Sequence, residues 1–120
     1  MIANPVRLTL SAILLWAALG MMPAWAQAMR LDGWWIVLTS IRDDGSMAPH
    51  NQMRAFSTQM RACNIEVFSD VSAKFQGFAP GLLVGTLGAF ASEAEAQRQL
   101  TNVRRCAPGA YVKRARHLGE

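Results

Sequence analysis

The sequence of 120 residues predicts one α+β domain behind an export signal. Two kinds of segment alternate along it: runs of β-branched and aromatic residues, and two stretches with apolar residues at helical spacing. Turns that contain Gly or Pro separate them, and the order reads strand, helix, strand, strand, helix, strand. A doubled unit of this kind is expected to fold as a four-stranded antiparallel sheet with two helices on one face, the split ferredoxin-like arrangement.

The first 26 residues have the order of a secretory signal. Arg7 precedes the apolar stretch 8–22, and Ala24 and Ala26 place small residues where a signal peptidase cuts. We expect cleavage after Ala26, with a cut after Ala28 as a close alternative, and a periplasmic location. The competing interpretation is an uncleaved membrane anchor, because residues 8–26 are just long enough to span a bilayer.

Cleavage would leave room for one small domain and no stable membrane anchor. We expect residues 27–33 to be a lead-in, residues 34–116 to form the domain and residues 117–120 to be a tail.

The first half of the domain predicts a strand, a helix and a strand. The run WWIVLTSI at 34–41 is rich in β-branched and aromatic residues, and the turn-rich RDDGSMAP follows it. Met53, Phe56 and Met60 then recur at helical spacing, which predicts a helix over 50–63. The short run IEVF at 65–68 predicts the second strand.

The second half repeats this order after a long connection over 69–81, in which Phe75, Phe78 and Pro80 should partly pack. A strand is predicted over 82–89, with a sharp turn at Gly88. Ser92 has Glu95 three residues later, the pattern of a capping box at the start of a helix. Pro108 and Gly109 end this helix, and AYVKR at 110–114 predicts the last strand.

Alternation along the first strand divides its side chains between the two faces of the sheet. Ile36, Leu38 and Ser40 are expected on one face, and Trp35, Val37, Thr39 and Ile41 on the other. Since the apolar stripes of both helices cover only one face, the other face should stay partly open.

The two cysteines, Cys63 and Cys106, follow the two predicted helices at matching points, in MRAC-NIEVF and VRRC-APGAYVK. In the split arrangement the two helices run in opposite directions, so their C-terminal ends lie far apart. A disulfide needs Cα atoms within about 7 Å. We therefore expect no disulfide within the chain. The cysteines would stay buried and reduced or pair between chains, unless the topology differs from the predicted one.

The stretch Leu87-Gly88-Ala89-Phe90, followed by Ala91-Ser92 and Ala94-Glu95-Ala96, resembles the second repeat of the SPOR domain family, and 110–113 is similar to its closing strand. The resemblance extends over about 34–116. It implies a bacterial envelope module that binds septal peptidoglycan, preferring glycan strands without stem peptides, on the open face of the sheet. The residues implied as ligand contacts are Trp35, Val37, Thr39, Val84, Thr86, Tyr111 and Lys113.

The first strand departs from the family pattern. Members often have a Gln that contacts the glycan, followed by a Gly-small-Phe turn, and here Val37, Thr39 and Ile41 stand at the positions of the Gln, Gly and Phe. Valine cannot hydrogen-bond a sugar. The alternative function is therefore an envelope protein–protein interaction module of the same fold, which uses the same face or the basic C-terminal strand and binds no glycan.

Several ligand candidates also have a structural interpretation. Trp34 and Trp35 could stack on sugar rings or fill one end of a small core. Tyr111 and Lys113 could contact a ligand or belong to a solvated edge strand, where lysine prevents aggregation.

Composition argues against other functions. The net charge of +4 is concentrated near the C-terminus, which suits an anionic polymer, a membrane surface, an acidic partner or a solubilising end, and we expect no nucleic acid ligand. His50 and His117 are isolated, and Met53 and Met60 suit a helix core better than a copper site, so we expect no metal. Because no third group supports a Cys–His pair, we expect no enzymatic activity and no cofactor.

Overall fold

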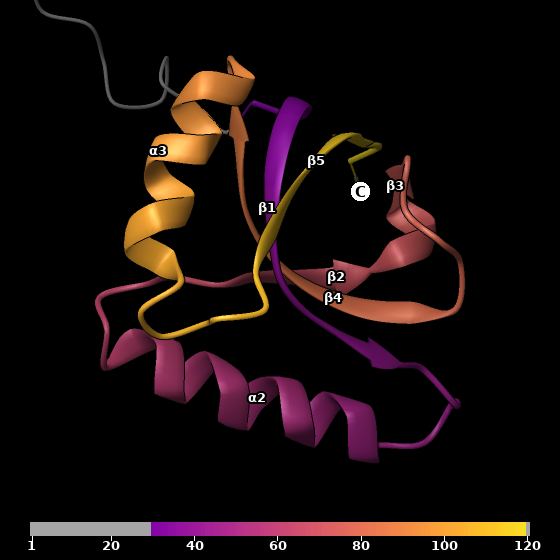
Figure 1. Cartoon of the computed structure of the whole chain (residues 1–120). Coiled ribbons are helices and arrows are strands. Elements are labelled where there is room, and N and C mark those ends of the chain that lie inside the picture. The colour runs from indigo at the N-terminus through magenta and orange to yellow at the C-terminus, as the bar shows by residue number, and fades with distance from the viewer. Residues whose placement is uncertain (1–29, 120) are drawn as a thin grey trace, which may run out of the picture.

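The computed structural model describes residues 30–119, so the predicted signal peptide and its cleavage site lie outside the described residues. The α+β class is confirmed (Figure 1). Within the described part, no helix is long and apolar enough to cross a membrane. The elements in order are β1 (Asp32–Arg42), α2 (Ala48–Arg61), β2 (Phe68–Val71), the 3-10 turn η2 (Ser72–Lys74), β3 (Phe75–Gln76), β4 (Leu82–Phe90), α3 (Glu93–Val103) and β5 (Tyr111–His117).

The sheet has five antiparallel strands in the order β2-β4-β1-β5-β3, so the prediction of four strands is wrong. The additional strand β3 pairs Phe75 with His117 and Gln76 with Arg116 of β5. Two residues are too short a strand to show any periodicity in the sequence.

The second strand begins three residues later than predicted. The backbone N–H of Ile65 donates to the Met60 carbonyl at 3.0 Å, and Asn64 adopts φ 59, as in a helix C-terminal cap. This cap uses residues that the prediction had placed in, or next to, the second strand.

The sheet is curled because β2 and β3, its two edge strands, are joined only by η2. Three intervening residues cannot span a flat sheet of five strands, whose neighbours lie about 4.8 Å apart. The two edges therefore approach each other, and in Figure 1 the chain passes directly from β2 to β3 on the right of the molecule. The sheet has a concave face inside the curl and an outer face towards the helices.

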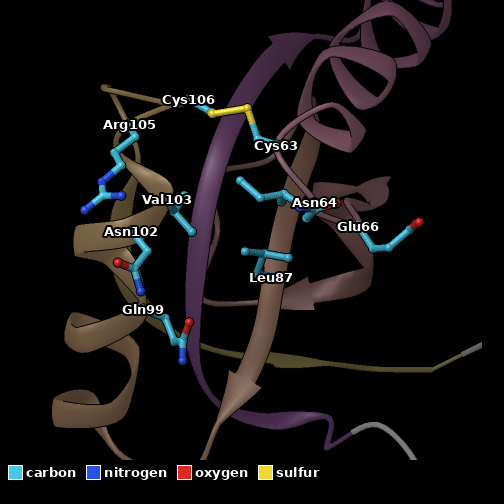
Figure 2. A pocket seen from close by; sticks show the side chains of 10 residues that line it. Cys63, Asn64, Glu66, Leu87, Gln99, Asn102, Val103, Arg105 and Cys106 are labelled. Carbon is cyan, nitrogen blue, oxygen red and sulfur yellow. A yellow bond between two sulfur atoms is a disulfide. The ribbon is translucent and has the colours of Figure 1, made fainter.

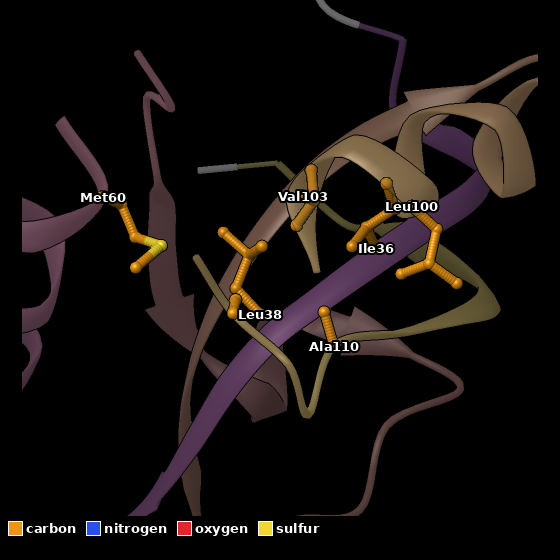
Figure 3. Close-up of a cluster of buried hydrophobic side chains, with 7 residues drawn as sticks. Ile36, Leu38, Met60, Leu100, Val103 and Ala110 are labelled. Atoms are coloured by element: carbon orange, nitrogen blue, oxygen red, sulfur yellow. The ribbon is translucent and has the colours of Figure 1, made fainter. Parts of the chain in front are cut away.

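Each face of the sheet has its own hydrophobic core. On the outer face, side chains of α2 and α3 pack on β1 (Figure 3); the buried members are Ile36, Leu38, Met60, Leu100, Val103, Ala107 and Ala110. The concave face holds the second core, with Trp35, Phe75, Val84 and Ala115 buried and Phe68, Phe78, Leu82 and Ala89 around them. The Trp35 indole N–H donates to the Ala115 carbonyl at 3.2 Å, so its one polar atom is satisfied.

Short polar side chains precede both helices, and one of them caps α3. Ser92 Oγ accepts a hydrogen bond from the Glu95 N–H at 3.1 Å, which confirms the predicted cap of α3. Before α2, Asp44 Oδ1 accepts from the Ser46 hydroxyl and backbone N–H, and Ser46 Oγ accepts from the Ala48 N–H. These bonds from Ser46 stabilise the carboxylate and lower the pKa of Asp44 below its ordinary value.

Cys63 and Cys106 form a disulfide within the chain, with a Cα–Cα distance of 6.6 Å, so the prediction of no intramolecular bridge is wrong. Both cysteines sit in the turn that ends a helix, where their N–H groups donate to Met60 and Val103. The two helices do not lie side by side: α2 crosses below the sheet while α3 stands against it, and their C-terminal ends meet at one corner (Figure 1).

Two register shifts interrupt the pairing of β1 with β4. Val37 pairs with Thr86 and Thr39 with Gly85, so Leu38 is an extra residue on β1. Trp34 pairs with Phe90 and Ile36 with Leu87, so the second shift lies at Gly88-Ala89. The predicted turn at Gly88 is therefore a bulge within a continuous β4, which bends the strand without ending it.

Candidate functional site

Most of the residues expected on an open sheet face are buried in the concave core. Trp35, Val37, Val84 and Thr86 are all 2% exposed or less. The Thr86 hydroxyl also donates to the Phe68 carbonyl of β2 at 2.9 Å. The expectation that these four side chains are open to a ligand is wrong, because the segment from β2 to β3 curls over them.

Thr39 does not share a face with Val37. Its Cγ2 lies next to Gly85 on the side where Met53 of α2 packs, while Ser40 lines a small cavity together with Val37. The extra residue in the bulge at Leu38 exchanges the two faces beyond it, as a shift of one residue must in a strand with a period of two. The predicted alternation therefore holds only up to the bulge.

Tyr111 and Lys113 are the two candidates that reach solvent. Tyr111 is 47% exposed, and the Lys113 ammonium lies 5.9 Å from the centre of the Phe78 ring. Both line a cavity of about 70 Å³ at one end of the concave core, together with Phe78 and Leu82. A cavity of this size can hold a few waters but not a sugar ring, so only the rim is available to a large ligand.

The two tryptophans have different environments. Trp35 is core, as the structural interpretation of the pair expected. Trp34 is half-buried, and the Arg114 guanidinium lies over its ring at 5.5 Å while it pairs with Asp32 at 3.7 Å. Because a cation already lies over the Trp34 ring, a sugar could stack there only by displacing Arg114.

A much larger cavity than the one beside Tyr111 and Lys113 lies elsewhere, at the corner where the helices end. This disulfide groove has a volume of about 510 Å³ and runs between α3 and the turn that follows α2 (Figure 2). The residues that line it are Cys63, Asn64, Ile65, Glu66, Leu87, Gln99, Asn102, Val103, Arg105 and Cys106.

The walls of the disulfide groove are polar and its floor is apolar. Gln99 and Asn102 project from α3, Asn64 lies opposite them on the other segment, and Leu87 of β4 lies between (Figure 2). Glu66 is next to Asn64, and its carboxylate points away from α3. Each amide offers both a donor and an acceptor, and the side chains of Glu66 and Arg105 add one charge of each sign. The arrangement can bind an uncharged polar ligand with hydrogen bonds on both sides.

The disulfide groove was not predicted from the sequence. Its two walls are far apart along the chain, since the cysteines that join them are separated by 43 residues, and no local pattern indicates that they meet. One signal was present. Gln99 and Asn102 are three residues apart, off the buried stripe of Ala96, Leu100 and Val103, and the two cysteines mark matching points after the helices.

His117, which has no candidate metal ligand near it in the sequence, pairs with Asp70 in the structure. Its Nδ1 accepts from the Gly119 N–H at 3.1 Å, so Nε2 carries the proton and donates to Asp70 Oδ2 at 2.9 Å. The ring is buried and lies edge-on to Phe68 and Phe75. Since both ring nitrogens have partners, this pair serves to join β5 to β2 rather than to activate a substrate.

The described residues contain no group of three or more His, Cys, Asp or Glu side chains arranged to hold a metal ion. A scan against protein-family models, a search of curated proteins and a search of solved structures each found no match for this chain. The resemblance to the SPOR domain therefore stays a prediction from the residues.

Proposed function

We propose that this protein is a non-catalytic periplasmic module that binds glycan strands of peptidoglycan, and that it does so through the disulfide groove instead of the sheet face. The observation that carries this proposal is the composition of the groove. An apolar floor between two amide side chains on one wall and one on the other, in a cavity of about 510 Å³, resembles small-ligand sites, in which a few polar groups orient the ligand over apolar surface.

The chemistry of a sugar fits these walls. A sugar ring presents hydroxyl groups that both donate and accept hydrogen bonds, and C–H faces that pack on apolar surface. The amides of Asn64, Gln99 and Asn102 supply donors and acceptors together, and Ile65 and Leu87 supply apolar contact. No aromatic side chain lines the groove, so hydrogen bonds must provide most of the selectivity.

Rigidity of the groove also favours binding. The disulfide joins the two walls directly. Each of its cysteines lies in the turn that ends a helix, and its backbone N–H is hydrogen-bonded there. A site that is ordered before the ligand arrives loses less conformational entropy on binding.

In this proposal the protein resembles the SPOR family in its fold but binds glycan on a different surface. The four longer strands lie in the order β2-β4-β1-β5, which suits the split arrangement, and β3 with the curl is then an addition. Because this addition fills the concave face with aromatic side chains, the family's usual binding surface would be lost here and the contact would move to the helical layer.

The second candidate is an envelope protein–protein interaction module. The observation that favours it is the exposed pair Tyr111 and Lys113 beside Phe78, at the rim of the concave core. Exposed tyrosines are frequent anchors of protein interfaces.

Co-sedimentation with purified peptidoglycan, with and without its stem peptides, tests the proposal on the protein recovered from cells that express the full chain. We expect pelleting that is greater with stripped glycan. The double substitution Gln99→Ala with Asn102→Ala should weaken binding about tenfold, since two lost hydrogen bonds amount to roughly 1–3 kcal/mol.

A matched control removes the same two side-chain types from an exposed part of α2, Asn51→Ala with Gln52→Ala, and should leave pelleting unchanged. Loss of binding in Tyr111→Ala, with no loss in the groove variant, would move the site to the rim of the concave core. A folded protein that does not sediment even at low salt would overturn the glycan function and leave the protein-interaction candidate.

A further inference from the structure

A second groove, which the proposed function does not use, lies between α2 and the edge strand β2. Its volume is about 410 Å³. One wall is formed by His50, Arg54, Ser57 and Arg61 of α2, and the other by Ser69 and Asp70 of β2. We refer to it as the arginine groove.

The helical wall of the arginine groove is a regular row. Its four residues are spaced by four, three and four positions, which places them on one side of α2. Arg54 and Arg61 are seven residues apart, so they are separated by about 10.5 Å along the helix axis. Ser57 lies between them with a hydroxyl that can donate to the same ligand.

The two arginines have no counter-ion from the fold. Both are exposed, and neither takes part in any ion pair found within residues 30–119. Asp70 is the acidic residue that lines the groove, and its carboxylate is already engaged by the His117 ring at 2.9 Å, the Val71 N–H at 2.8 Å and the Lys74 ammonium at 3.9 Å. The groove therefore presents an unbalanced positive charge.

The arginine groove lacks the backbone cradle of a typical phosphate site. Phosphate sites typically use a cradle of backbone N–H groups at a helix N-terminus or in a glycine-rich turn. Here Arg54 is in the middle of α2, Arg61 is in its last turn, and no glycine lines the groove. A guanidinium fork binds a carboxylate or a phosphate with two parallel hydrogen bonds, so the lack of a backbone N–H cradle is the feature that favours carboxylates here.

We propose that the arginine groove binds a linear polymer that carries carboxylate groups, with one carboxylate at Arg54 and a second at Arg61. The two sites are two helical turns apart, so a ligand with only one carboxylate engages half of the groove. This proposal does not depend on the disulfide groove and concerns a different surface of the protein.

Titration calorimetry with polygalacturonate, a carboxylated glycan, tests the proposal on the protein recovered from cells that express the full chain. We expect binding that weakens as salt is added, because the polymer releases counter-ions when its charges are neutralised. The variant R54Q/R61Q should bind about tenfold or more weakly, since it removes two hydrogen-bonded charge pairs. Uncharged dextran should not bind.

Two further variants separate a specific site from general attraction. R98Q/R116Q removes the same charge from exposed positions outside the groove, and its affinity should stay close to that of the unmodified protein. R54K/R61K keeps the charge but loses the planar forks, and we expect it to lose most of the affinity. Circular dichroism and the unfolding midpoint verify that each variant is folded.

Equal losses in R54Q/R61Q and R98Q/R116Q would overturn the proposal, because net charge alone would then explain the binding. It would also be overturned by full affinity in R54K/R61K, by tighter binding of inorganic polyphosphate at the same charge concentration, or by no binding at low salt. Since the probe is not peptidoglycan, none of these outcomes bears on the disulfide groove.

Discussion

Gly88 is a single residue on which the packing of the concave core depends, because it lies against the ring of Trp35. Gly88 lies in the bulge of β4 with φ 144, a conformation that side chains rarely adopt. A Cβ atom there would come within 3.0 Å of the Trp35 ring and 3.1 Å of the Trp34 carbonyl. The absence of a side chain at this position therefore leaves room for the buried Trp35 indole.

We expect Gly88→Ala to destabilise the fold by about 2–4 kcal/mol, because backbone strain and overpacking of the ring each cost on the order of 1–3 kcal/mol. Urea unfolding measures this change. Gly109→Ala is the matched control, since its new Cβ would meet nothing within 4 Å. It should be neutral or slightly stabilising. Equal effects of the two substitutions would show that Gly88 is not held against Trp35 as the structure has it.

At the scale of elements, the sequence was sufficient for the helices. Met53 and Met60 in α2, and Leu100 and Val103 in α3, are buried as their spacing predicted, and Ser92 caps α3. Periodicity says which side of a helix is buried but not how two helices are oriented relative to each other. That angle depends on tertiary packing, and an assumed antiparallel pair led to the wrong prediction for the cysteines.

Strand pairing shows the same limit. The bulge at Leu38 has no local signal in a run of apolar residues, yet it moves Thr39 to the helical face and Ser40 to the concave one. The residues of the disulfide groove were missed for a related reason. They are polar loop and helix residues whose common location depends on the meeting of the two helix ends.

The disulfide should contribute substantially to stability, because it joins the ends of both helices across 43 residues of sequence. Closing a loop of this size in the unfolded chain corresponds to about 4 kcal/mol in the chain-entropy model, and measured values are often lower. We expect the double variant Cys63→Ser with Cys106→Ser to have a free energy of unfolding about 2–4 kcal/mol lower, as measured by guanidinium unfolding.

Adding a reductant to the unmodified protein should lower its stability to that of the double variant, and the double variant itself should not respond. If reductant leaves the unmodified protein unchanged, the cysteines are not paired and the helix ends do not meet. A loss of glycan binding in the reduced protein at a temperature where it remains folded would also support the disulfide groove as the binding site.

At the scale of the whole molecule, the main difference from expectation is the closure of the sheet. The sequence predicted that Phe75 and Phe78 pack, but not where. They pack on the concave face of the sheet, which was expected to be open to a ligand from the resemblance to the SPOR domain. Asp70 of β2 and His117 of β5, which are 47 residues apart, are hydrogen-bonded across the curl. Of the seven predicted contacts, only Tyr111 and Lys113 remain accessible in the way that was expected.

Hydrogen exchange of the Trp35 indole N–H distinguishes a closed sheet from an open one. This group is buried and bonded to the Ala115 carbonyl, so we expect it to exchange as slowly as the slowest backbone amides, through global unfolding. The half-buried Trp34 provides an internal comparison and should exchange faster. On an open sheet face the two indoles would exchange at similar, fast rates.

Removing one ring from the curl should open this core. Phe75 is 5% exposed and contacts Trp35 edge-on at 5.2 Å, so Phe75→Ala should cost about 3–5 kcal/mol and speed exchange at Trp35. Leu118→Ala, at a residue 52% exposed, should change neither quantity. Because the disulfide groove lies on the opposite face, a Phe75→Ala protein that still folds should keep its affinity for stripped glycan. Loss of that affinity without unfolding would indicate that the ligand is held by the concave face after all.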